Sequence, residues 1–266
     1  MAPHVFQWSD VNPAEDFVFG ETKKGRDHDG FSVPLKVKDK NGMLQNFVHI
    51  GPEMAIPFGL KEKVTKFGSR FSCDMTFPNV NRNEQGELQG PDDLVGYAKW
   101  LFDIEELNKQ ACIKNSKEWF GKTYKMDVIN EFYFKSIMDA RQPEKYSPTF
   151  TTRIKHSPSK GFETKFYNQK REPIKFEDIK AGSRLIPLIE TTGLWFAGKS
   201  FGMSFKVLQV MVFEKEEFDT CVIDNPYAPA VTEAPEGAID PSFNMPEKRP
   251  GSPVDQGGKR AKVDDE

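Results

Sequence analysis

Apolar residues alternate with polar ones over the first third of the chain, which is the period of β-strands. Residues 31–50 hold two alternating runs on either side of Asn41-Gly42, a dipeptide typical of tight turns, so they are predicted to form a β-hairpin. Residues 70–77, RFSCDMTF, alternate in the same way and predict a third strand. The Gly- and Pro-bounded segment 51–60 and the polar segment 78–90 are interpreted as loops.

The period then becomes helical. Pro91 stands where a first helical residue fits, two aspartates follow it, and apolar residues recur every three or four positions as far as Leu107. This pattern predicts an amphipathic helix that runs to about Asn115. A second, shorter helix is predicted over residues 125–137.

Alternation returns after residue 148 and continues to residue 213. The first run, PTFTTRIKHS, is predicted to turn Arg153 and Lys155 outward, and the second run, GFETKFYN, turns Lys165 and Tyr167 outward. We expect these two runs to be consecutive strands that pair in register, so that three charges and one ring share a face. Two or three further strands over residues 183–213 complete the pattern.

These periods divide the chain into three parts. Residues 1–30 are predicted to form an N-terminal arm, and residues 31–224 a mainly β (α+β) domain with a helical insert at about 91–138. Residues 225–266 are rich in proline, glycine, alanine and acidic residues, and are predicted to be a disordered tail with both acidic and basic residues.

The net charge of −3 conceals an uneven distribution. Residues 1–147 hold 20 basic and 22 acidic side chains, residues 148–213 hold 11 and 5, and residues 214–266 hold 6 and 13. A basic block followed by an acidic tail indicates an electrostatic site and an element that competes for it. The 23 phenylalanines favour a large core and also suit a protein that stacks on flat ligands.

Several function classes are not indicated. The three cysteines and four histidines are scattered, so neither a disulfide framework nor a zinc site is predicted, and no cofactor is expected. No pair of acid and base residues stands out, so we do not expect an enzyme. No apolar run approaches 18 residues and no signal peptide is visible, so an intracellular protein without a membrane partner is expected.

The stretch 191–213 fits two functions. Gly193, Gly198, Lys199 and Ser200 match G-x-x-x-x-G-K-[ST], the pattern of a phosphate-binding P-loop. A P-loop precedes a helix, whereas residues 201–213 alternate with period two and contain several valines, which favours a strand. The ATPase is therefore the less favoured alternative.

Four segments resemble those of a known family, in the same order: PEMAIPFGL, NSKEWFGK, YSPTFTTRIK and GLWFAGKSFGMSFKVLQVMV. They are similar to the single-stranded DNA-binding proteins of nucleo-cytoplasmic large DNA viruses, which are related to the podophage type. This resemblance implies an OB-like five-stranded barrel with a helical insertion, which binds single strands without sequence preference. The tail differs from the phage pattern, in which a longer acidic C-terminus ends in an aromatic residue.

A protein that binds single strands non-specifically needs cations for the phosphates and aromatic faces for the bases. The predicted DNA-binding residues are the outward-facing residues and the cations and rings of adjoining turns: Lys122, Tyr124, Arg153, Lys155, Lys165, Tyr167, Lys170, Arg171, Trp195, Lys199 and Lys206. Taken singly, each cation is better explained as a solvated surface charge, and Trp195 as part of the core. The hypothesis depends on the cluster.

The tail contains two basic clusters separated by nine residues, Lys248-Arg249 and the group Lys259, Arg260 and Lys262, which resemble a bipartite nuclear-import signal. The alternative is a basic stretch that contacts nucleic acid electrostatically. An import signal predicts a location in the host nucleus or at a viral replication site, and importin as a partner.

The predicted function is therefore that of a single-stranded DNA-binding protein in viral DNA replication and recombination. Single-stranded DNA is the expected partner, and replication proteins and a second copy of the chain are further candidates. The alternative is a virion or scaffold protein that uses the same fold for protein contacts.

Overall fold

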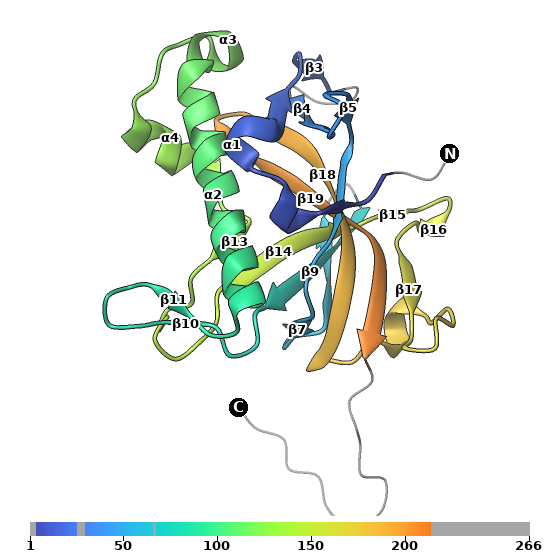
Figure 1. Ribbon diagram of the computed structural model, residues 1–266. Coiled ribbons are helices and arrows are strands. Elements are labelled where there is room, and N and C mark those ends of the chain that lie inside the picture. Colours follow the sequence, from blue (N-terminus) through green and yellow to red (C-terminus); the bar gives the residue numbers. More distant parts are fainter. Residues whose placement is uncertain (1–3, 26–29, 66–67, 214–266) are drawn as a thin grey trace, which may run out of the picture. The chain divides into compact units, whose positions relative to one another are not determined.

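The computed structural model describes residues 4–25, 30–65 and 68–213, all of which belong to one structural unit, Met1–Glu217. Strands outnumber helices in this unit (Figure 1), which confirms the predicted mainly β fold. The predicted tail over residues 225–266 lies outside the described residues.

Five strands form a closed barrel: β7 (Met54–Ile56), β9 (Gly68–Thr76), β14 (Thr149–Ile154), β18 (Ser183–Ala197) and β19 (Ser200–Phe213). Around the barrel β7 pairs with β9, β9 with β14, β14 with β19, β19 with β18, and β18 with β7. Only the β14–β19 pair is parallel, and the last two strands exchange places relative to their order in the chain. This is the OB-like barrel that was expected.

Alternation along the strands separates the core from the surface. In β9 the side chains of Cys73 and Met75 are buried, and in β14 those of Phe150, Thr152 and Ile154 are buried. Because successive side chains of a strand point to opposite faces, the intervening residues lie on the outside of the barrel. The apolar pattern of the sequence thus determines which residues form the outer surface.

The β18–β19 hairpin occupies the stretch that matches the P-loop pattern. Ala197 pairs with Ser200, and the two residues between them form a tight turn in which Gly198 has φ +60°. A glycine with positive φ at the first central position is typical of a type II′ hairpin turn. Since a strand follows the motif, the helix N-terminus that a P-loop requires is absent, and the ATPase alternative is not supported.

The helical insertion lies between β9 and β14 and consists of α2 (Asp92–Lys114), α3 (Ser116–Phe120) and α4 (Met126–Phe132). Helix α2 agrees with the predicted helix and has Asn115 as its C-cap. Its buried face includes Tyr97, Leu101 and Ile104, which are at helical spacing. Figure 1 shows α2 along one side of the barrel.

The N-terminal elements pack on this helix and on the sheet: β1 (Phe6–Gln7), η1 (Trp8–Asp10), α1 (Pro13–Asp16), β2 (Phe17–Phe19) and β3 (Lys23–Lys24). Trp100 Nε1 donates a 3.0 Å hydrogen bond to the carbonyl oxygen of Val11, and the ring of Trp8 lies 5.2 Å from that of Tyr97. The predicted hairpin around Gly42 is confirmed, because β4 (Phe31–Lys38) pairs antiparallel with β5 (Leu44–Gln45). Both β4 and β6 (Phe47–Ile50) pair with β18.

The remaining elements are short: β8 (Leu60–Thr65), β10 (Asn81–Arg82), β11 (Leu88–Gln89), β12 (Tyr133–Phe134), β13 (Ile137–Met138), β15 (His156–Ser157), β16 (Gly161–Phe162), β17 (Lys165–Tyr167) and η2 (Phe176–Asp178). Two segments interpreted as loops therefore contain strands, β7 in 51–60 and the β10–β11 hairpin in 78–90. The second predicted helix ends early, at Phe132, because the next two residues pair with β19.

The expected pairing of the runs 148–157 and 161–168 is wrong for most of their length. Only β15 and β16 pair with each other, whereas β14 pairs with β9 and β19, and β17 pairs with β19. Strand β19 is long enough to take β14 and β17 one after the other along the same edge. The local alternation of apolar and polar residues does not determine which distant strand each run pairs with.

Candidate nucleic-acid interface

Outward-facing side chains of four neighbouring strands form a row across the barrel. Lys61 lies opposite Ser72, Ser72 opposite Arg153, and Arg153 opposite Lys206. Because residues that lie opposite each other in a sheet share a face, these side chains belong to one outer surface. Glu190 lies opposite Lys206 and ends the row.

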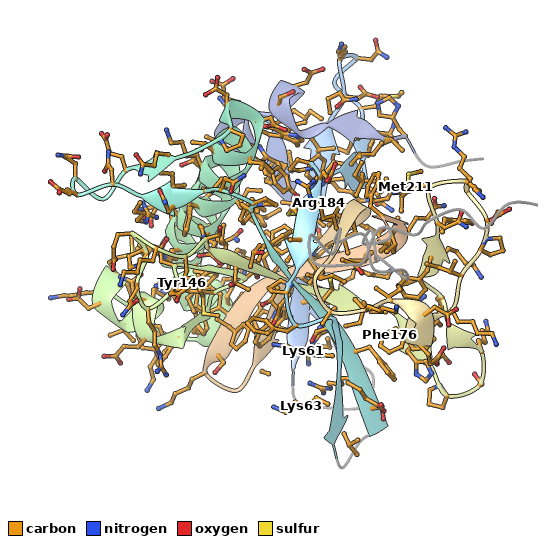
Figure 2. The ribbon with its side chains drawn as sticks, turned by 90° about the horizontal axis from the view of Figure 1, so that it is seen from below. Lys61, Lys63, Tyr146, Phe176, Arg184 and Met211 are labelled. Atoms are coloured by element: carbon orange, nitrogen blue, oxygen red, sulfur yellow. The ribbon has the colours of Figure 1, made fainter. Side chains whose placement is uncertain are left out.

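A second row of cations adjoins the first. Lys63 lies opposite Arg70 in the β8–β9 hairpin, which projects from the body in Figure 2 with Lys61 and Lys63 labelled along it. Lys155 follows Arg153 by two positions, just after the end of β14. We call the six cations of the two rows the basic face: Lys61, Lys63, Arg70, Arg153, Lys155 and Lys206.

Half of the basic face is ion-paired: Lys61 with Asp74, Lys155 with Glu163, and Lys206 with Glu190. The Nζ–carboxylate distances are 2.6 Å for Lys61 and 3.0 Å for Lys206. Ion pairs at a protein surface contribute about 0–1 kcal/mol each. A phosphate can therefore replace the carboxylate partner of a half-exposed cation such as Lys155 at little cost.

The other half carries uncompensated charge. Lys63, Arg70 and Arg153 are exposed, and none of them forms an ion pair within the part of the chain that the structure describes. Partial burial lowers the pKa of the Arg153 guanidinium, and the positive charge of Arg70 lowers it further. Two like charges thus lie close together without a carboxylate between them, an arrangement that an anionic ligand stabilises.

The same outer surface continues along β19 in both directions from Lys206. Toward the hairpin turn, four residues away, Gly202 lies opposite Trp195, which is half-buried. In the other direction, Met211 lies opposite Tyr167 of β17. Aromatic side chains therefore adjoin the basic face at both ends.

A cleft of about 300 Å³ lies beside Tyr167. Its rings include Phe162 and Phe176, which stack on each other with centroids 4.5 Å apart, and Phe176 is labelled in Figure 2. The exposed lysines Lys165 and Lys175 also line this cleft. Flat rings with cations beside them are the groups that bind an unpaired base and its phosphate.

The predicted site residues of β17 lie on this surface, but their strand pairs with a different partner from the expected one. Lys165 pairs with Gln209 of β19 and not with a residue of β14, yet its side chain still lies on the outside of the barrel. Lys170 and Arg171 occupy an exposed turn in which Arg171 has φ +62°. The structure thus brings Arg153, Lys165 and their neighbours to one outer surface through β19.

Other predicted residues lie apart from the basic face. Tyr124 packs against Phe120 and Phe132, with ring centroids 5.6 and 5.4 Å away. Phe120 in turn contacts the inward-facing Phe201, so this aromatic group lies on the inner side of the β18–β19 hairpin. Lys122 is exposed near this group, and Lys199 is exposed in the hairpin turn. The predicted import residues, Lys248, Arg249, Lys259, Arg260 and Lys262, lie outside the described residues.

Sequence reasoning missed Lys61, Lys63 and Arg70. The sequence did contain a sign of these charges. KEKVT alternates lysines with other residues directly after the turn at Gly59, as in a strand. Arg70 lies an even number of positions from the outward-facing residues of β9 and so faces the same way. Residues 61–69 were assigned to no element, so the two lysines were not placed on a strand, and Arg70 was placed at the start of the predicted strand 70–77 without being connected to the site. Phe134 of β12, an exposed ring whose centroid lies 6.0 Å from that of Trp195, was also missed, since it falls in the second predicted helix.

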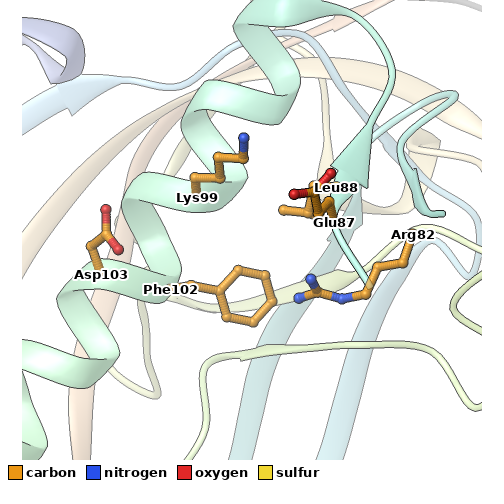
Figure 3. Close-up of a pocket in the computed structure, with 6 residues that line it drawn as sticks. All are labelled: Arg82, Glu87, Leu88, Lys99, Phe102 and Asp103. Atoms are coloured by element: carbon orange, nitrogen blue, oxygen red, sulfur yellow. The ribbon is translucent and has the colours of Figure 1, made fainter. Parts of the chain in front are cut away.

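A second cleft, of about 420 Å³, lies between the β10–β11 hairpin and α2 (Figure 3). The Arg82 guanidinium carbon lies 5.2 Å from the centre of the Phe102 ring, and Arg82 Nε donates to Asp139 Oδ1 at 2.8 Å. Glu87 and Asp103 also line this cleft. The negative charges of these carboxylates repel a phosphate ligand, so the basic face is the better candidate interface.

No group of three or more His, Cys, Asp and Glu side chains could hold a metal ion among residues 4–25, 30–65 and 68–213. None of the helices in these ranges is both long and apolar enough to cross a bilayer.

Residues 93–228 match a family model that is described as a family of unknown function, DUF5871. No curated protein matches the chain. Among solved structures, the chain is similar to gp2.5, a single-stranded DNA-binding protein encoded by bacteriophage T7, with 12% identity over 66% of this chain and 91% of that chain and a TM-score of 0.42.

The chain is also similar to the single-stranded DNA-binding protein of bacteriophage Enc34, with 16% identity over 77% of this chain and 96% of that chain and a TM-score of 0.35. The structure of that protein in complex with single-stranded DNA gives 17% identity over 75% and 97% and a TM-score of 0.36.

Proposed function

The chain belongs to the DUF5871 family, whose function is unknown, and we propose that it is a sequence-non-specific single-stranded DNA-binding protein. The observation that carries this proposal is the basic face, where Lys63, Arg70 and Arg153 lie together on the outer surface of the barrel and have no carboxylate partner among residues 4–25, 30–65 and 68–213. Uncompensated cations attract a phosphate backbone, and contacts to phosphates do not depend on the sequence of the bases.

The position of this face in the fold supports the same proposal. OB-folds bind oligonucleotides on the face of their second and third strands, between the loops that follow the first and fourth strands. In this barrel those strands are β9 and β14, the β8–β9 hairpin follows the first strand, and the turn at Gly198 follows the fourth. The basic face lies on β8, β9, β14 and β19.

We propose a binding protein and not an enzyme. Catalytic groups usually combine a perturbed pKa with a place in a cleft. The groups whose pKa burial perturbs most, such as those of His49, Cys73 and Tyr97, are core side chains that line neither of the two clefts described above. They are explained by packing.

The resemblance noted in the sequence leads us to propose a role in viral DNA replication and recombination, in the host nucleus or at a viral replication site. Replication proteins are expected partners, and the basic clusters of the tail are proposed to bind importin. A virion or scaffold protein with the same fold is the alternative. This alternative is less favoured because a protein that makes only protein contacts does not need its cations on one face, whereas Lys61, Arg153 and Lys206 form one row.

The proposal is tested by fluorescence anisotropy of a labelled oligo-dT with the purified chain, at several salt concentrations and with duplex competitor. The triple variant Lys63→Ala, Arg70→Ala, Arg153→Ala is expected to bind more weakly and to lower the slope of log K against log salt by about 2, since each lost phosphate contact on a single strand removes about 0.7.

The matched control removes the same charge elsewhere, through Lys99→Ala, Arg141→Ala and Lys145→Ala, three exposed cations on or after the helical insertion. This control is expected to retain the wild-type affinity and slope. Absence of oligo-dT binding by the wild-type chain at low salt would refute the proposed function. An equal loss in both triple variants would refute the assignment of the basic face.

A further inference from the structure

An exposed phenylalanine lies beside the half-buried Trp195. Phe134 is 59% exposed, although burying such a ring stabilises a protein by about 1.5–3 kcal/mol. Its neighbour Tyr133 is buried and accepts a 3.1 Å hydrogen bond from Asn108 Nδ2, which fixes β12 against β19. Since adjacent side chains of a strand point to opposite faces, anchoring Tyr133 inward turns Phe134 outward.

The pairing of five strands places Phe134 in a row with Trp195. Phe134 lies opposite Gly202, Gly202 opposite Trp195, Trp195 opposite Ser32, and Ser32 opposite Lys23. The two rings lie 6.0 Å apart, centroid to centroid, with an interplanar angle of 56°. We call Trp195 and Phe134 the aromatic platform.

Gly202 makes this platform possible. A Cβ atom at position 202 would lie 2.8 Å from the Phe134 carbonyl oxygen and 3.1 Å from Trp195 Cζ2. Without a side chain there, the indole lies directly over the β19 backbone and beside the Phe134 ring. Two exposed cations adjoin the row, Lys23 at its far end and Lys199 in the hairpin turn, and neither is ion-paired in the described part of the chain.

The platform belongs to the same outer surface as the basic face. Gly202, Ser204 and Lys206 alternate with the buried Met203 and Phe205 along β19, so they share one face. Four residues of a strand span about 13 Å. Because stacked nucleotides are about 3.4 Å apart along a strand, about four nucleotides connect a base on the platform with a phosphate at Lys206, and fewer do so when the strand is extended.

We propose that the aromatic platform stacks an unpaired base and thereby makes the chain prefer single strands over duplex DNA. This inference rests on the proposed function. The basic face attracts phosphates of either form, whereas only a single strand can present the flat face of a base to Trp195 and Phe134 without unstacking. The platform therefore supplies a preference that charge alone cannot supply.

The test compares Phe134→Ala with the wild-type chain on oligo-dT and on an abasic oligonucleotide of equal length. The variant is expected to bind oligo-dT about 5- to 150-fold more weakly, the range for loss of one stacking contact, with an unchanged salt slope because no charge is removed. Its affinity for the abasic strand and for duplex should equal that of the wild type. Phe134→Tyr should restore binding of oligo-dT.

The matched control is Tyr146→Ala, which removes another exposed ring, 62% exposed, in the loop after the helical insertion, and should leave all affinities unchanged. An affinity of Phe134→Ala for oligo-dT equal to that of the wild type would overturn the inference and indicate a protein contact at the platform. Equal losses on the thymidine and abasic strands would overturn it as well. These results differ from failure of the proposed function, in which the wild type itself does not bind.

Discussion

Acidification should destabilise the fold through one buried histidine. His49 of β6 is fully buried, its ring stacks on Phe47 at 4.8 Å, and its Nε2 atom is 2.8 Å from the Tyr97 hydroxyl. Its other ring nitrogen, Nδ1, has no hydrogen-bond partner among the described residues. Burial disfavours the charged imidazolium and lowers the pKa of His49 from 6.5 to about 3.

The size of the effect follows from the two pKa values. The unfolded chain takes up a proton at His49 as the pH falls below 6.5, and the folded chain does so only near pH 3, so the unfolded state gains stability over this range. At pH 5 the difference is 1.5 pH units, which corresponds to about 2 kcal/mol of lost folding free energy relative to pH 7. Above pH 6.5 the contribution is fully present.

The assay is urea unfolding at pH 7 and at pH 5, for the wild type and for His49→Gln. Glutamine can still hydrogen-bond the Tyr97 hydroxyl but does not titrate, so the variant reports the pH dependence of all other groups. The wild type should lose about 2 kcal/mol more than the variant between the two pH values. If both proteins lose the same free energy, His49 is not buried in the neutral form and the packing of β6 against α2 is wrong.

Two further predictions concern the central hairpin and the tail. Gly193→Ala should destabilise the fold severely, because the new Cβ would lie 2.1 Å from the Val33 carbonyl oxygen and φ is +127°. Gly198→Ala, at φ +60° with open space around it, should cost only about 1–2 kcal/mol of backbone strain. Thermal unfolding of both variants measures the difference, and equal losses of stability would contradict the close approach of β4 to Gly193. Residues 225–266 hold eight acidic and five basic side chains. Their deletion should tighten the binding of oligo-dT at low salt and have little effect at high salt, where charge interactions are screened. An unchanged affinity at low salt would show that the tail does not compete for the site.

The sequence was sufficient for those features that depend on local periodicity. The alternation of β9 and β14, the amphipathic pattern of α2 and the turn at Gly42 each predict their element, because side-chain burial repeats with the period of the element itself. With these elements the outward direction of Arg153 was also predictable. The structure places it on the exposed side of β14.

Partner choice was not predictable in the same way. Lys165 could face Arg153 across a strand pair or follow it along β19. The choice depends on contacts between residues about 44 to 53 positions apart, and no local pattern encodes them. Phe134 shows the same limit. The segment MDVINEFYF has a helical pattern, yet pairing with Phe201 and Gly202 converts its last two residues into β12. Tertiary contacts override local propensity there.

The apparent P-loop pattern has a separate structural cause at each of its glycines. Gly193 is required where β4 approaches, since any side chain would meet the Val33 carbonyl, and Gly198 is required by the positive φ of the hairpin turn. Gly202, four residues further along, leaves room for Trp195 beside Phe134. The glycine-rich stretch therefore does not wrap a phosphate with its backbone. It lets a long hairpin bend, turn and carry an exposed aromatic platform on the surface that also bears the basic face.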